Sequence, residues 1–137
     1  MRASILLVAL VAVTACSDQA STDAPGDYRA LAECSARMDA VSNLYAAIAD
    51  TSSGDSSNEL RSTGELRAAA ARVLKAEAEK LAGAASAEVE TIITETHASI
   101  AAEKETKPFE DFGVWLGSQA DLCAPLVQEI IKAQVTE

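Results

Sequence analysis

The first long apolar pattern after residue 26 has the period of an α-helix. Its apolar positions, alternately three and four residues apart, are Leu31, Cys34, Met38, Val41, Tyr45 and Ile48. Side chains at this spacing lie on one face of a helix, here over almost three heptads. The pattern therefore predicts a first helix that begins near Asp27 and carries Cys34 on its apolar face.

A serine-rich segment, residues 50–63, contains no run of apolar residues, so we expect a loop there. Ser62 and Glu65 then have the spacing of a capping box, which indicates the start of a helix. We therefore predict a second helix from about Thr63 to Ala82. The residues expected on its inward face are Leu66, Ala70, Val73, Leu74 and Leu81.

Gly83 is typical of a helix end, and Ser86 of the cap of a third helix. The residues expected inward on this third helix are Val89, Ile92, Ile93, Thr96 and Ile100. One long helix bent at Gly83 is the alternative. Opposite charge favours two antiparallel helices, although exposed ion pairs contribute less than about 1 kcal/mol each. The residues concerned are Arg67, Arg72, Lys75 and Lys80 on the second helix, and Glu88, Glu90 and Glu95 on the third.

Lys107-Pro108 predicts the start of a last helix, where the missing N–H of proline costs nothing. Its apolar face comprises Phe109, Phe112, Trp115, Leu116, Ala120, Cys123, Leu126, Val127, Ile130 and Ile131. Pro125 is expected to kink this helix or to restart it after Asp121. The whole pattern predicts an all-α domain over residues 27–137, an antiparallel bundle of about four helices with the last one kinked near Pro125.

The first 15 residues differ from this domain and have the layout of a secretory signal. Arg2 precedes an apolar stretch of nine residues, Ile5 to Val13, whereas a membrane-spanning helix needs about 20. The four residues Val13-Thr14-Ala15-Cys16 resemble the lipobox of bacterial lipoproteins, a resemblance that covers only the first 16 residues. It implies that residues 1–15 are a signal peptide and that the Cys16 thiol is acylated. Ordinary secretion, with Cys16 a free or paired thiol, is the alternative.

By the same resemblance, the residue after the cysteine indicates whether the lipoprotein is kept in the inner membrane or moved to the outer one. In enterobacterial lipoproteins an Asp there commonly means retention in the inner membrane, and here it is Ser17. We therefore expect an anchor in the outer membrane, facing the periplasm. A Gram-positive surface lipoprotein would carry a similar lipobox. Residues 16–26 contain no large apolar side chain and are predicted to form a flexible tether.

Charge narrows the range of partners. Without residues 1–15 the chain keeps 21 acidic and 10 basic residues, a net charge of about −11. Nucleic acid is excluded as an expected partner because binding it requires a basic surface. Anionic lipid headgroups are repelled too, which leaves acylated Cys16 as the contact with the bilayer. A basic envelope protein is the expected partner, and residues 84–137, with 10 acids and 3 bases, are the expected contact region.

Two cysteines remain once Cys16 is acylated. Cys34 and Cys123 lie on the apolar faces of the first and last helices, which are commonly neighbours in a bundle. In a compartment that permits disulfides we predict that they are joined, the alternative being two buried reduced thiols.

The sequence contains few residues that would indicate a catalytic, metal or cofactor site. His97 is the single histidine and the chain has no Cys-x-x-Cys, so we expect no catalytic, metal or cofactor site. Met38 and His97 as axial haem ligands are a remote alternative. Phe109, Phe112 and Trp115 form either part of the core or a binding patch, and core is the commoner role for aromatics at helical spacing.

Two functions from different classes follow. The first is a tethered, non-catalytic module that binds a protein partner in the envelope. The second is a carrier that holds a small ligand or cofactor between its helices. An enzyme is not expected, because no catalytic motif is present.

Overall fold

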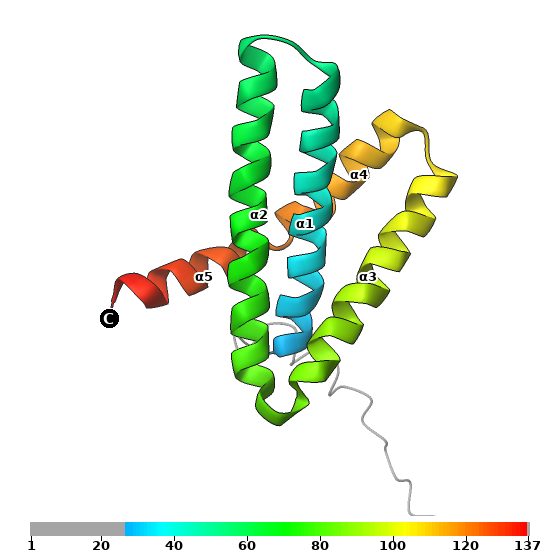
Figure 1. Cartoon of the computed structure of the whole chain (residues 1–137). Helices are drawn as coiled ribbons and strands as arrows, with labels where there is room; N and C mark the ends of the chain where they lie inside the picture. Colours follow the sequence, from blue (N-terminus) through cyan, green and yellow to red (C-terminus); the bar gives the residue numbers. More distant parts are fainter. Residues whose placement is uncertain (1–26, 137) are drawn as a thin grey trace, which may run out of the picture.

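The computed structural model describes residues 27–136, which form helices joined by short turns (Figure 1). Three long helices are followed by two shorter ones: α1 (Tyr28–Thr51), α2 (Asp55–Ala82), α3 (Ser86–Thr106), α4 (Phe109–Asp121) and α5 (Ala124–Val135). The predicted all-α class is confirmed. The predicted count of about four is wrong, because three long helices make up the bundle and the expected last helix is divided in two. The predicted signal peptide, Cys16 and the tether lie outside the described residues.

α1 and α2 form an antiparallel pair, visible as two adjacent columns in Figure 1. The Asp27 carboxylate caps α1 by accepting a hydrogen bond from the backbone N–H of Arg29, 2.9 Å away. At the other end, Gly54 has φ +67°, a conformation that favours glycine, and this residue turns the chain into α2.

The loop expected over residues 50–63 is a wrong prediction, because α2 begins at Asp55. Contacts with α1 stabilise this serine-rich first part of the helix against its modest helix propensity. The Ser57 hydroxyl donates to the Ala49 carbonyl at 2.9 Å, and Arg61 pairs with Asp50 at 2.8 Å. The capping box expected at Ser62 therefore lies in the interior of α2.

α1 and α2 approach each other closely at Gly64. A Cβ atom at this position would lie 3.3 Å from both the Ser42 carbonyl oxygen and the Tyr45 Cβ. About two turns further along the pair, the buried Ser35 hydroxyl donates to the Ala71 carbonyl at 2.8 Å. Small residues on both helices thus let the two backbones approach each other.

α2 and α3 are separate helices, as the charge pattern favours. A short 3₁₀ turn, η1 (Gly83–Ala85), joins them, with Gly83 at φ +54°. Figure 1 shows α3 diverging from α2 beyond this turn. Of the predicted ionic contacts between the two helices, Lys75–Glu90 is present, whereas Glu88 pairs with Arg29 of α1 at 3.4 Å.

The chain after α3 packs first against α1, through α4, and then leads away from it in α5. α4 begins directly after Pro108, packs against α1, and ends at Asp121. A turn at Leu122 and Cys123 separates it from α5, which has Pro125 in its first turn, so the helix restarts rather than kinks. α5 contacts α2 and projects past it, and no residue of α5 is buried (Figure 1).

The core lies where α1, α2, α3 and α4 meet. Its larger buried members are Leu31, Met38, Val41, Leu74, Val89, Ile92, Ile100, Phe112 and Leu116. Four residues expected to face inward are exposed instead: Leu66 (70%), Leu81 (41%), Phe109 (60%) and Ile131 (52%). Leu66 follows buried Gly64 by two positions, which on a helix places it on the opposite side. Ile131 is exposed because α5 is not enclosed by other helices.

Candidate functional site

The structure brings together the two cysteines that the sequence pairs. Cys34 of α1 and Cys123 of the α4–α5 turn have their sulfur atoms 2.07 Å apart and their Cα atoms 5.5 Å apart. Both side chains are buried. The bond attaches the turn before α5 to the centre of the bundle, which is a structural role. Cys16 lies outside the described residues, so its acylation stays a prediction.

The aromatic residues of α4 do not form one patch. Phe112 is buried and its ring centroid lies 5.9 Å from that of Trp115, which packs partly buried against the core. The Lys107 ammonium lies 5.5 Å from the centroid of the Trp115 ring. Phe109, by contrast, is exposed. Two of the three aromatics therefore serve the core.

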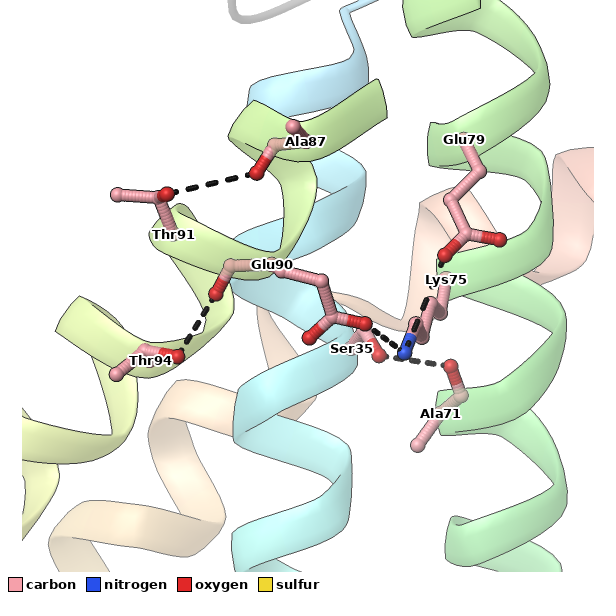
Figure 2. Close-up of polar contacts among 8 residues, drawn as sticks. All are labelled: Ser35, Ala71, Lys75, Glu79, Ala87, Glu90, Thr91 and Thr94. Carbon is pink, nitrogen blue, oxygen red and sulfur yellow. Dashed lines mark hydrogen bonds and ion pairs between the residues drawn. The ribbon is translucent and has the colours of Figure 1, made fainter. Parts of the chain in front are cut away.

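A hollow of about 240 Å³ lies between α1, α2 and α3. Its polar lining includes Ser35, Asp39, Arg72, Lys75 and His97. Figure 2 shows Lys75 of α2 reaching Glu90 of α3, with Ser35 of α1 beside the pair. His97 Nε2 lies 3.4 Å from the Asp39 carboxylate. Lys75 and His97 thus lie beside carboxylates of the chain itself, whereas Arg72 of the same lining forms no ion pair within residues 27–136.

Two residues of α1 next to each other in sequence face different helices. The sulfur of buried Met38 accepts a hydrogen bond from the guanidinium of Arg67, on α2, at 3.6 Å. The Asp39 carboxylate lies beside His97, on α3. Met38 and His97 therefore have separate surroundings, which gives no support to a shared axial-ligand site. Within residues 27–136 no group of three or more His, Cys, Asp or Glu side chains is placed to hold a metal ion.

Polar contacts also hold the first turn of α3. The Tyr28 hydroxyl donates to Glu88 at 2.6 Å, and this hydrogen bond raises the pKa of Tyr28 above its ordinary value of 10.0. The hydrogen bond to Glu90 likewise raises the pKa of Lys75 above 10.5. Glu88 and Glu90 thus already have partners within the chain.

Two further hollows differ in their linings, one being mixed polar and apolar and the other mainly apolar. One, of about 400 Å³, lies between α1, α2 and α5. Its lining combines apolar and polar side chains, namely Leu31, Leu126, Ile130 and Ala133 with Glu77, Lys80, Glu129 and Gln134. The other, of about 180 Å³, lies between α1 and α4 and is lined by Val41, Leu44, Tyr45, Ile48, Gly113 and Gly117. The first is within the size range of small-ligand pockets, about 300 to 1,000 Å³.

The outer side of α4 and the turn after it combine exposed apolar and acidic side chains. We name this set the α4 surface: Glu110, Asp111, Val114, Ser118, Asp121 and Leu122, all exposed. Val114 is 77% and Leu122 67% exposed. None of its three carboxylates takes part in an ion pair within residues 27–136. α4 itself contains no basic residue.

Sequence reasoning identified the acid excess after residue 84 but missed Val114 and Leu122. The signal was present, since both are large apolar residues that fall off the stripe formed by Phe112, Leu116 and Ala120. A large apolar residue outside the core-facing stripe of a helix is exposed when no other element covers that side.

No described helix is long and apolar enough to cross a membrane. No protein-family model matches the chain, and neither a curated protein nor a solved structure matches it.

Proposed function

We propose that this chain is an envelope lipoprotein, anchored by acylated Cys16 in the outer membrane and facing the periplasm, that acts as a non-catalytic module binding a basic protein partner. The anchor rests on the lipobox resemblance of residues 13–16. The tether that follows would allow the helical domain to reach a partner near the membrane.

One structural observation carries the binding role. Of the seven large apolar side chains exposed in residues 27–136, five lie after α3: Phe109, Val114, Leu122, Ile131 and Val135. Single exposed apolar residues are ordinary, but their concentration in one part of a domain is typical of an interaction region. The same region has an excess of acids, which supports a basic partner through electrostatic attraction.

A carrier of a small ligand is the second candidate. The observation in its favour is the hollow of about 400 Å³ between α1, α2 and α5. Its ligand would be amphipathic, since Leu31, Leu126 and Ile130 share the lining with Glu77, Lys80, Glu129 and Gln134.

Native mass spectrometry distinguishes the two. The acylated full chain is extracted from its own envelope in mild detergent and its complexes are weighed. Binding of a partner predicts a complex with a basic protein, whereas a bound mass of a few hundred daltons would favour the carrier. An acylated chain that is always alone would contradict the proposed binding role.

A further inference from the structure

The α4 surface presents an apolar pair at a spacing that a single partner helix can span. Val114 and Leu122 are eight positions apart, and Leu122 keeps helical backbone angles, φ −62° and ψ −21°. At 1.5 Å per residue, the two positions are about 12 Å apart along the helix axis. Eight positions are two full turns plus about 80°, so the two side chains fall within a sector of about 80° on the outer side of α4.

Three carboxylates surround this apolar pair. Glu110 and Asp111 lie one turn before Val114, and Asp121 lies next to Leu122. None has a basic partner in the described chain, unlike Glu88 and Glu90, which are bound by α1 and α2. The first two also lie in the first turn of α4, where the helix dipole stabilises negative charge. These three exposed carboxylates are therefore accessible to the basic side chains of a partner.

We infer that the α4 surface binds an amphipathic helix of a partner protein, one whose apolar side chains are flanked by Lys or Arg. The inference rests on the proposed function and names the surface and the partner chemistry. Apolar side chains of the partner would cover Val114 and Leu122, while its basic flanks would neutralise Glu110, Asp111 and Asp121. An exposed helix face with apolar anchors and complementary charge is a recurrent mode of helix recognition.

The charge distribution also distinguishes this occupant from two others. A second copy of the chain would bring two sets of three unpaired carboxylates together in a symmetric contact, and like charges at close range oppose binding. An anionic lipid surface is repelled by the same groups. A basic helix is the occupant that satisfies both the apolar and the charged residues.

The first test uses a probe of defined chemistry. A synthetic Leu/Lys peptide, designed as an amphipathic helix, is titrated into the full mature chain, and a Leu/Glu peptide of the same pattern serves as the negative probe. The Leu/Lys peptide should bind, and the affinity should fall as salt shortens the Debye length from about 10 Å at 0.1 M to about 3 Å at 1 M.

Two variants and two matched controls locate the binding. Glu110→Gln/Asp111→Asn/Asp121→Asn should weaken the Leu/Lys complex about ten-fold or more, as should Val114→Ser/Leu122→Ser. The charge control is Glu59→Gln/Glu65→Gln/Glu95→Gln, exposed acids of α2 and α3 that form no recorded ion pair. The apolar control is Leu66→Ser, at a side chain 70% exposed. Both controls should bind like the wild type.

Each opposite outcome overturns the inference. Absence of Leu/Lys binding to the wild type, equal weakening by the control variants, or retention of affinity by both α4-surface variants would each do so. Native mass spectrometry then separates this inference from the proposed function. If the α4-surface variants keep the basic partner that the wild type carries, the surface is wrong and the function stands. If the wild type carries no partner, the function itself is contradicted.

Discussion

Cys34 and Cys123 are 89 positions apart in the chain, yet their Cα atoms lie 5.5 Å apart and their sulfurs are at bonding distance. The bond joins the middle of the bundle to the turn from which α5 leaves. Because no residue of α5 is buried, this covalent link holds the C-terminal part of the chain at the site where α4 ends.

Reduction of the Cys34–Cys123 bond should lower the melting temperature by more than about 10 °C. The bond closes a loop of about 90 residues, which on the chain-entropy model stabilises the fold by about 4 to 5 kcal/mol. Thermal unfolding of oxidised and fully reduced protein measures the difference. Digestion without reductant should also yield one cross-linked peptide pair, and alkylation of both thiols in untreated native protein would refute the bond.

Gly64→Ala should destabilise the fold by about 1 kcal/mol. Alanine is the better helix former, but its Cβ would lie 3.3 Å from the Ser42 carbonyl oxygen and the Tyr45 Cβ, so α1 and α2 must move apart. Urea unfolding measures the change. Gly117→Ala is the matched control, since no atom lies within 4 Å of its added Cβ. That variant should be unchanged or more stable by up to about 1 kcal/mol, and the same gain at Gly64 would contradict the close packing.

The first turns of α3 should loosen at alkaline pH. Tyr28 and Lys75 have pKa values raised in the folded chain by hydrogen bonds to Glu88 and Glu90. A raised folded-state pKa stabilises the protein fully below the unfolded-state value, and this contribution is lost as pH rises through the folded-state value. Stability should therefore decline above about pH 10.

Urea unfolding of a Glu88→Gln/Glu90→Gln variant tests the origin of that decline. Both carboxylates that hold the raised pKa values are removed, so the variant should show a smaller alkaline loss than the wild type. Glu95→Gln, at an exposed carboxylate without a recorded ion pair, is the control and should behave as the wild type. An identical alkaline loss in all three proteins would show that these contacts are not responsible.

Periodicity predicted the parts of the fold that are decided locally. The apolar stripe of the first helix, the break at Gly83 and the start of the third helix at Ser86 all agree with the structure. The proximity of Cys34 and Cys123 was also predictable, because both lie on apolar faces and few thiols compete.

Features that depend on contacts between helices were not predictable from periodicity. Residues 55–63 are mostly polar and were expected to be a loop, yet α1 provides partners for Ser57 and Arg61 that favour helix. Likewise, an apolar stripe shows which side of a helix is suited to burial but not whether another helix covers it. Ile131 is exposed because no helix encloses α5, whereas Leu66 is exposed because it lies on the side of α2 opposite buried Gly64. Val114 and Leu122 were missed because they lie outside the apolar stripe of α4.

Cys16→Ser should block acylation and leave unprocessed or mislocalised precursor. The lipobox resemblance places the acyl chain on this thiol, and several acyl chains give a far more stable anchor than one. Fractionation of the envelope and intact-mass measurement check the outcome. Globomycin should likewise accumulate the uncleaved form of the wild type. Normal processing together with unchanged membrane fractionation in both experiments would contradict the anchor.

The central claim, that a basic partner binds this anchored chain at the α4 surface, is tested most directly by photo-crosslinking in the intact envelope. A photoreactive amino acid is placed at position 114 or, as the control, at position 66, which is similarly exposed on α2. The account predicts an adduct with a basic protein from position 114, lost in Glu110→Gln/Asp111→Asn/Asp121→Asn, and little adduct from position 66. Adducts from position 66 alone, or adducts from position 114 with lipid or a second copy of the chain, would contradict it.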